Sequence, residues 1–319
     1  MKTVSYCEEN FAAWDEFVGR SLNGTFLHTR RYLSYHGKRF RDVSLLLKDE
    51  DGKIVGVFPA AIDPNHDKRI VSHPGITYGG ILHTGKLRGA RMLEAFDNLK
   101  EFYAAQDFAS LRYKAVPEIY HHAPAADDLY ALFINNARRY RCDLSCAIGF
   151  AERPAVSSRR GRSLKKALKA GVHVEEGTHY AAALWGILED NLTRKYEARP
   201  VHTLEEITHL QTLFSEQIKF VAASLNGEVI AGVVLFVTDM TVHAQYIASS
   251  ETGYETSALD AVFNFCIEAA ATQGKRYFDF GTSNEDDGRK INATLYNFKS
   301  EFGGGGIAHE FYELNLQEN

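Results

Sequence analysis

The sequence lacks the features that mark secreted, metal-binding and membrane-spanning proteins. It has only four cysteines in 319 residues, and no two of them have the C-x-x-C spacing of a zinc site. The N-terminus carries acidic residues where a signal peptide needs an apolar run, and no window reaches 18 uninterrupted apolar residues. We therefore expect a cytoplasmic protein with free thiols, no metal and no transmembrane segment.

An excess of positive charge is also missing. The chain has 36 basic and 41 acidic residues, a formal net charge of −5, so no global basic field can hold nucleic acid. Apolar residues make up 45 % and charged residues 24 %, the usual balance of a soluble globular chain. The thirteen histidines show no H-x-x-x-H spacing, which again argues against a metal site.

The chain is long enough for two domains of ~150 residues, and its two halves have the same pattern. Each half contains a hairpin, a third strand, a helix, a strand, a helix and a closing strand. The repeat of about 170 residues is far longer than the period of a solenoid, so we infer a duplicated domain. The expected strands of the first half are 43–48, 53–62, 69–72, 110–115 and 142–148, and its helices pass through Leu93 to Tyr103 and Leu129 to Ala137.

The second half has the strongest hairpin signal, Asn226-Gly227 between strands 220–225 and 228–237. Further expected strands are 241–248, 276–280 and 307–314. One helix begins with a capping box at Ser257 and Asp260 and ends at Gly274; another passes through Leu295 and Phe298. Helices 180–196 and 204–218 precede the hairpin, and Thr203 and Glu206 form a capping box for the second of them.

The polar stretch 154–158 separates the halves. It predicts an N-terminal domain over 1–155 and a C-terminal domain over 156–319. We expect each to be an α/β (α+β) unit with a mixed, mainly antiparallel sheet flanked by helices.

Four segments of the second half carry a family resemblance. Residues 159–172 include six cations between Arg159 and Lys169, and 195–200 read KYEARP. Residues 278–283 read FDFGTS, and 297–304 read NFKSEFGG. Together with the duplicated element order, these segments resemble the FemAB-like branch of the GNAT acyltransferases, which includes peptidoglycan bridge-forming aminoacyltransferases. The resemblance implies tandem GNAT-like domains.

The resemblance also implies a function. It points to an N-acyltransferase that moves an acetyl or aminoacyl group to the amine of a phosphate-bearing cell-envelope precursor, either a small molecule or lipid-linked. An amino-sugar or a peptidoglycan intermediate would be such an acceptor. The alternative is a non-catalytic GNAT-like protein that only binds a ligand. Peripheral attachment to the inner face of the membrane is left open, and the sequence does not indicate the oligomeric state.

Acyl transfer to an amine needs a group that removes the amine's proton, positive charge or donors for the oxyanion, and alignment of the reactants. Asp279, in an apolar strand that ends at Gly281, is either a base with a raised pKa or a brace for the following loop. The resemblance places Phe298 and Lys299 at the catalytic cleft, where Lys299 would hold the transition-state charge. The competing interpretation of Lys299 is a solvated side chain on an amphipathic helix.

Candidate acceptor contacts come from several segments. Arg160 and Arg162, in the cationic run, could clamp phosphates or belong to a solvated helix face. The resemblance suggests that Arg30, Arg31 and Lys38 hold a nucleotide-linked or lipid-linked substrate. Two tyrosines could line a sugar pocket or be packed with bonded hydroxyls: Tyr78, before two glycines, and Tyr246, in the third strand of the second half.

The acyl donor is acyl-CoA or aminoacyl-tRNA. Donor contacts are assigned by the resemblance to Ser250, Gly253 and Tyr254, and to Thr282 and Ser283. The segment 249–257 has one glycine, two acids and no arginine, and so departs from an ordinary CoA phosphate loop. The tRNA donor is the less favoured one, because the chain is acidic and residues 197–202 leave no room for the coiled-coil arm that some members carry.

Overall fold

The computed structural model describes residues 1–196 and 198–317, without the side chains of Lys195 and Tyr196. Contacts divide the chain into two units. Unit 1 contains residues 1–144, 284–290 and 308–317, and unit 2 contains 145–283 and 291–307. The division at 155/156 stays our proposal for the duplicated sequence. In the structure, strands β8 (Arg138–Gly149) and β16 (Gly305–Asn315) have residues in both units.

Unit 1 contains two sets of strands. A four-stranded sheet has the order β1-β2-β3-β6, formed by Lys2–Ser5, Leu45–Lys48, Ile54–Phe58 and Leu82–His83. The second set is β4 (Ala61–Asp63), β5 (His66–Val71), β7 (Ser110–Lys114) and the end of β16. Here β5 lies antiparallel to β4 and parallel to β7, and β7 lies antiparallel to residues 311–315. The expected strand 53–62 is split because Pro59 cannot donate to a ladder, so its halves join different sheets.

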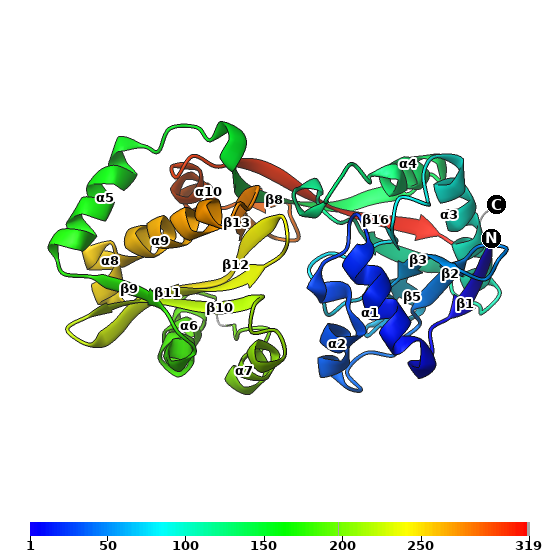
Figure 1. Ribbon diagram of the computed structural model, residues 1–319, viewed down its shortest axis with the longest axis horizontal. Helices are drawn as coiled ribbons and strands as arrows, with labels where there is room; N and C mark the ends of the chain where they lie inside the picture. The colour runs from blue at the N-terminus through cyan, green and yellow to red at the C-terminus, as the bar shows by residue number, and fades with distance from the viewer. Residues whose placement is uncertain (197, 318–319) are drawn as a thin grey trace. The chain divides into compact units, whose positions relative to one another are not determined.

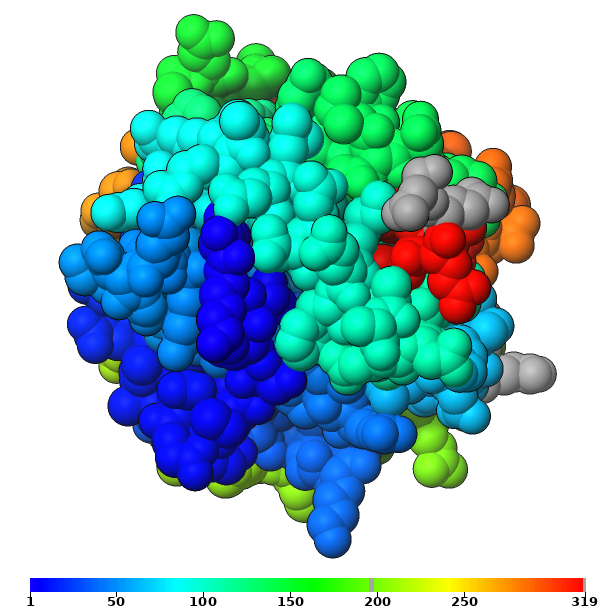
Figure 2. All heavy atoms as spheres, turned by 90° about the vertical axis from the view of Figure 1, so that its right-hand side faces the viewer, coloured from blue at the N-terminus to red at the C-terminus, as the bar shows by residue number. Residues whose placement is uncertain are grey.

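The main helices of unit 1 are α1 (Phe11–Arg20), α2 (Arg30–Leu33), α3 (Ala90–Ala104) and α4 (Asp127–Ile134). Met92, Phe96, Leu99 and Tyr103 recur along one face of α3 and are fully buried in the core of unit 1. The N-terminal strand and α1 were not predicted from the sequence. The region of α4 lies on the surface of this unit (Figure 2). The sequence predicts that this helix continues to Ala137, but it ends at Ile134, and a turn then leads into β8.

Unit 2 has the strand order β8-β13-β12-β11-β10-β9. Its remaining strands are β9 (His173–Glu176), β10 (Ile218–Leu225), β11 (Glu228–Val237), β12 (Thr241–Ser249) and β13 (Tyr277–Thr282). All neighbouring pairs are antiparallel except β12 with β13. Each unit thus has one parallel pair among antiparallel strands, and the predicted mixed, mainly antiparallel architecture is confirmed.

Helices cover both faces of the unit 2 sheet. They are α5 (Ser158–Lys169), α6 (Ala181–Tyr196), α7 (Leu204–Leu213), α8 (Glu251–Thr256), α9 (Ala258–Thr272) and α10 (Ala293–Ser300). Figure 1 shows α6 and α7 on one face and α9 on the other. Val262, Phe263 and Cys266 of α9 enter the core of this unit. No helix of the described residues is long and apolar enough to cross a bilayer.

Two predicted helix starts had different outcomes. The capping box of α7 is confirmed, since Thr203 and Glu206 each accept from the other's backbone N–H. The prediction of a capping box at Ser257 is wrong. Ser257 also ends α8 in the left-handed region, with φ of 62°, and its side chain caps nothing. An N-cap residue normally has extended backbone, so a serine held in this conformation cannot serve as one. Helix α8 itself occupies a segment predicted as loop.

The four cysteines are free thiols, as the sequence predicts. Cys146 and Cys266 are buried in unit 2, and burial raises the pKa of the Cys146 thiol to about 11.

The glycines after α10 make close packing possible. A Cβ on Gly303, where φ is +89°, would lie 2.4 Å from the carbonyl oxygen of Pro154.

Candidate active site

The parallel pair of unit 2 opens into a gap. Strands β12 and β13 are paired only from Thr241 and Tyr277 to His243 and Asp279. Beyond that point β12 continues for six residues and β13 for three. The pairing of β12 with β11 shifts register between Val234 and Leu235, which leaves Gln245 as the extra residue of a β-bulge. The bulge therefore lies just where the two strands separate.

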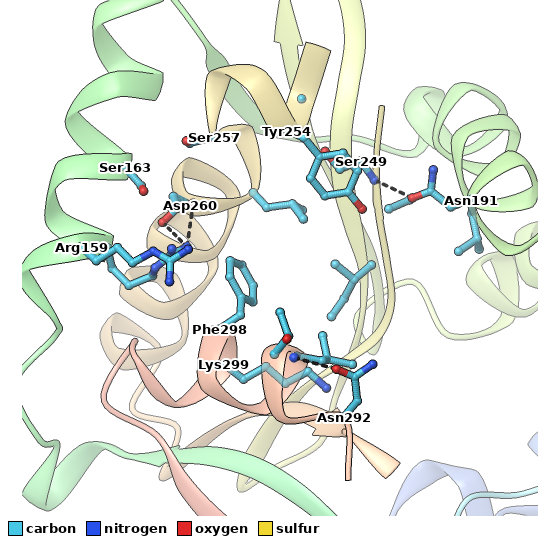
Figure 3. Close-up of a pocket in the computed structure, with 18 of the residues that line it drawn as sticks. Arg159, Ser163, Asn191, Ser249, Tyr254, Ser257, Asp260, Asn292, Phe298 and Lys299 are labelled. Atoms are coloured by element: carbon cyan, nitrogen blue, oxygen red, sulfur yellow. Dashed lines mark hydrogen bonds and ion pairs between the residues drawn. The ribbon is translucent and has the colours of Figure 1, made fainter. Parts of the chain in front are cut away.

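A pocket of about 790 Å³ lies beside the part of β12 that follows this separation. Its wall is formed by the end of β12 and by helices α5, α6, α8, α9 and α10. Figure 3 shows Phe298 and Lys299 on α10 at one end, Arg159 and Asp260 on one side, and Asn191 and Ser249 on the other. Polar wall residues other than the predicted ones are Arg159, Ser163, Asn191, Ser249, Ser257, Asp260, Asn292 and Thr294.

Lys299 lies in the pocket wall but is almost fully buried, with 3 % of its surface exposed. Its ammonium donates to the carbonyl oxygens of Gly281 at 2.9 Å and Thr282 at 2.7 Å. Burial lowers the pKa of Lys299 to about 8, although Asp279 nearby acts in the opposite direction. The interpretation of Lys299 as a solvated lysine is therefore wrong. A lysine has three N–H donors, so two backbone contacts leave one for a ligand.

Phe298 and Arg160 form one packed cluster. The Arg160 guanidinium lies 4.8 Å from the centre of the Phe298 ring and is 6 % exposed. It also pairs with Asp260 at 2.9 Å and Glu301 at 2.9 Å. Arg160 thus connects α5, α9 and the end of α10 inside unit 2, with Nε donating to Glu301 and Nη1 donating to Asp260.

Asp279 lies behind the pocket wall, with no exposed surface. One carboxylate oxygen accepts from the Ser145 hydroxyl and from the backbone N–H of Gly281 at 3.0 Å. The other lies 2.8 Å from Nδ1 of His243, whose side chain is 14 % exposed. Of the two interpretations of Asp279, this geometry favours the brace. A proton on Nδ1 directed at the carboxylate would leave Nε2 of His243 free to act as a base.

Gly281 connects the two polar groups. Its N–H donates to Asp279, and its carbonyl accepts from Lys299. With φ of +77°, it adopts a backbone conformation that favours glycine, and a Cβ there would lie 3.3 Å from Cε1 of His243. One glycine therefore positions both the predicted lysine and the histidine that the sequence analysis missed.

Two of the five predicted donor residues line the pocket and three do not. Gly253 and Tyr254 line the pocket, while the Ser250 hydroxyl caps α8 by accepting from the N–H of Gly253 at 3.1 Å. Thr282 is exposed, and its carbonyl binds Lys299. Ser283 is buried, and within the described residues its hydroxyl has no hydrogen-bond partner.

Asn191, on α6, is a further polar group of the pocket. It is 7 % exposed, and its Oδ1 accepts from the backbone N–H of Ser249 at 3.3 Å. Its Nδ2 has no partner among the described residues. A buried, unpartnered amide donor is costly, so a ligand that supplies an acceptor here would remove that cost.

The remaining predicted residues do not line this pocket. Arg30, Arg31, Lys38 and Tyr78 belong to unit 1, where buried Arg30 pairs with Asp42 and lies 3.7 Å from the Tyr6 ring centre. Tyr78 is packed against Tyr120, with ring centres 4.5 Å apart. In unit 2, Arg162 is exposed, and the Tyr246 hydroxyl lies 2.5 Å from Nδ1 of His202. The family-like segment 195–200 lies partly outside the described residues.

Sequence reasoning missed His243, Asn191 and Ser163 as site residues, and it named Arg159 only within the cationic run and Ser257 only as a helix cap and the end of the donor segment. His243 is three strand positions before Tyr246 and could have been found by pairing its strand with that of Asp279. Arg159 and Ser163 are four residues apart on α5, so they share one face of the helix. Asn191 carries no sequence signal, because a single asparagine in a helix pattern does not show that its side chain is buried.

Residues 156–296 match the family model described as acetyltransferase (GNAT) domain. Among solved structures, FemX aligns over 98 % of this chain and 97 % of its own, with a TM-score of 0.70 and 12 % identity. L-PGS from Bacillus licheniformis aligns over 97 % and 91 %, with a TM-score of 0.61 and 11 % identity. A tandem GNAT protein from the clavulanic acid biosynthesis pathway aligns over 100 % and 99 %, with a TM-score of 0.54 and 12 % identity. A search of curated proteins finds no significant match.

Residues 156–296 thus match a GNAT acetyltransferase domain, and the whole chain has the fold of FemX and of the tandem GNAT protein. The predicted duplication of GNAT-like domains is confirmed.

Proposed function

We propose that this chain is an N-acyltransferase whose unit 2 pocket binds the acyl donor, and whose acceptor is the amine of a phosphate-bearing cell-envelope precursor. The observation that carries the proposal is the opening between β12 and β13. Lys299 lines the pocket beside this opening, and the hydrogen-bonded His243 and Asp279 form the last pair before the strands separate.

The arrangement supplies the groups that acyl transfer needs. Nε2 of His243 accepts the proton of the attacking amine, while Asp279 holds the ring through Nδ1. A C–N bond forms at the acyl carbonyl, and the third N–H of Lys299 stabilises the developing oxyanion. The bond from the carbonyl carbon to the donor's sulfur or oxygen then breaks, and the proton leaves with the thiol or hydroxyl.

Acyl-CoA is the donor that we propose. Asn191 offers an unpartnered amide to the amide-rich arm of such a donor, and Gly253 and Tyr254 form the adjacent wall. Arg159 lies beside the start of α9, where backbone N–H groups and a cation together suit a diphosphate. Ser250, Thr282 and Ser283 remain proposed donor contacts at the ends of α8 and β13.

The acceptor class rests on the sequence resemblance to the FemAB-like branch. In unit 2, we propose that Arg160 and Arg162 contribute to binding its phosphates and that Tyr246 contributes to binding its sugar. In unit 1, phosphate contacts by Arg30, Arg31 and Lys38 and a sugar contact by Tyr78 are proposed separately, for that unit alone. The likeness to FemX and L-PGS supports the fold alone, so these contacts have to be tested one by one.

The test combines binding with turnover. The protein is heated with acetyl-CoA, longer acyl-CoAs, aminoacyl-tRNA and UDP-amino-sugars, and each pair of donor and acceptor is then assayed for the acylated product. We expect an acyl-CoA to raise the melting temperature, since a ligand at 100 times its Kd stabilises by ~2.7 kcal/mol. Stabilisation by aminoacyl-tRNA but by no acyl-CoA would replace the proposed donor.

A ligand-binding protein without catalysis is the second candidate. It is favoured by the two backbone carbonyls that hold Lys299 and by the pairing of Asp260 with Arg160, which leaves no unpaired carboxylate among the described pocket residues. The assay above separates the candidates. A donor that binds tightly but is never turned over with any amine acceptor would select the binding protein.

A further inference from the structure

The outer face of α5 carries a stripe of four cations, none of which lines the pocket. Arg162, Lys165, Lys166 and Lys169 are all exposed and occupy positions i, i+3, i+4 and i+7, so they lie along one side of the helix. We call these four residues the α5 basic stripe.

The stripe differs from the rest of α5 in its partners. Arg160 faces inward to Asp260 and Glu301, and Arg159 also lies near Glu301, at 3.6 Å. By contrast, no carboxylate in the described part of the chain pairs with any of the four stripe residues. The single polar contact of the stripe that the structure gives is from Arg162 to the Ser158 hydroxyl of the same helix, at 3.3 Å.

Helix α5 carries exposed positive charges and one exposed apolar side chain. α5 contains no acidic residue, although the chain as a whole has a net charge of −5. Leu168 lies between Lys166 and Lys169 in the sequence and is 60 % exposed, a large apolar side chain with no place in the core. α5 has no aromatic side chain on which a nucleic-acid base could stack.

We propose that the α5 basic stripe is a docking surface for an anionic lipid bilayer. Lysines and arginines on a helix near an anionic membrane surface each contribute about 1 kcal/mol, which is about five-fold in affinity. Leu168 adds a side chain that can enter the acyl boundary. The stripe holds the protein against the lipid, and its three lysines have no part in the proposed acyl transfer.

The experiment measures sedimentation of the full chain with two kinds of vesicle, phosphatidylcholine alone and phosphatidylcholine with about 30 % phosphatidylglycerol. We expect binding to the anionic vesicles and loss of that binding at high salt, because the attraction is screened. Lys165→Ala with Lys166→Ala should weaken partitioning about thirty-fold. Acyl transfer to a soluble acceptor should not change, since neither lysine lines the pocket.

The matched control removes two exposed cations that have acidic partners, Arg20 and Lys53. The variant Arg20→Ala with Lys53→Ala should bind vesicles as the native protein does. Equal partitioning of the native protein and the Lys165→Ala, Lys166→Ala variant, or equal binding to both kinds of vesicle, would overturn the proposal.

A fluorescence measurement separates the bilayer from RNA. Trp14 and Trp185 are both buried, so in Leu168→Trp the new indole dominates the solvent-sensitive emission. We expect a blue shift on adding anionic vesicles, because the indole enters an apolar layer. If the emission is unchanged, or if the stripe binds tRNA at about 150 mM salt more tightly than vesicles, the surface serves a polynucleotide and the lipid proposal fails.

Discussion

Each unit contains one parallel pair of strands at the equivalent place, and the space beyond that pair is open in unit 2 and filled in unit 1. In unit 2, β12 and β13 separate after their third pair, and a pocket lies beyond. In unit 1, β5 and β7 also have three pairs, but the gap is closed by the segment after β5. The backbone N–H of Gly79 donates to the carbonyl of Lys114 at 2.9 Å, and the N–H of Lys114 donates to the Ser72 hydroxyl at 2.8 Å.

Each unit also has a buried lysine near this point. Lys299 is held at the pocket, whereas the ammonium of Lys114 binds the carbonyl of Ile76 within the closing segment. Burial lowers the pKa of Lys114 to about 7, and Arg141 adds to that effect. Of the two repeated domains, unit 2 therefore has an open pocket beyond its parallel strands, and unit 1 has a closed segment at the equivalent place. The predictions below test that division of roles.

The largest effect is expected at His243. We predict that His243→Gln lowers kcat by ~10²–10⁴, because the amide keeps a polar side chain but cannot accept the amine's proton. Asp279→Asn should lower kcat as well, since the ring would lose the partner that orients it. Steady-state kinetics with the best acceptor measure both variants, and the melting temperature shows whether they fold. A fully active His243→Gln enzyme would remove the base that we assign.

Lys299→Met comes next, with an expected loss of ~10²–10³ in kcat and little change in acceptor binding. The charge it stabilises develops only in the transition state, and methionine keeps much of the stem's packing. Lys299→Arg should recover part of the rate. The matched control is Lys114→Met, which changes stability but not kcat per folded molecule. Equal losses of kcat in the two methionine variants would mean that the units do not differ as described.

The pH profile of kcat tests the charge state of Lys299. Its pKa of about 8 lies below the usual value, so the ammonium form is lost as pH rises through 8. We expect kcat to fall about tenfold per pH unit above that point, since one pKa unit is a factor of ten in the charged fraction. In Lys299→Arg this fall should move to higher pH. A rate that increases through pH 8 would instead make neutral Lys299 the active form.

A smaller effect is predicted for the closed gap of unit 1. A Cβ on Gly79 would lie 2.2 Å from the carbonyl oxygen of Ser72, so Gly79→Ala must displace backbone. We expect the free energy of unfolding to fall by ~1–3 kcal/mol, with kcat per folded molecule unchanged. Denaturant titration measures the first quantity. If donor affinity changed as well, the closed segment would be part of the site.

The smallest effect is expected from metal removal. The described residues include no group of three histidine, cysteine or acidic side chains that could hold a metal ion. We predict that dialysis against a chelator leaves both kcat and the melting temperature unchanged. Activity that is lost on dialysis and restored by one added metal would contradict this prediction.

Local sequence patterns predicted much of the fold but less of the site. Strand β11 was predicted over its observed range, because Asn226-Gly227 marks the turn before it and its residues are nearly all apolar. The pairing of His243 with Asp279 spans 36 positions and depends on strand register, which no local pattern contains. The run 159–169 similarly gives no indication that Arg160 is buried while Arg159 is largely exposed, although both line the pocket. That difference is decided by the carboxylates of Asp260 and Glu301 on other elements.

The strand β16 has a consequence for how the chain folds during synthesis. Unit 1 takes its first 144 residues from the start of the chain, yet β7 pairs with residues 311–315, and Leu314 and Leu316 complete its core. At ~5–20 residues per second, a ribosome needs roughly ten to thirty seconds to make the residues between. During that time β7 lacks its partner, and its exposed edge is open to wrong pairing. The first unit to be translated is therefore among the last parts of the molecule to be completed, so a nascent chain stalled before β16 should depend on chaperones.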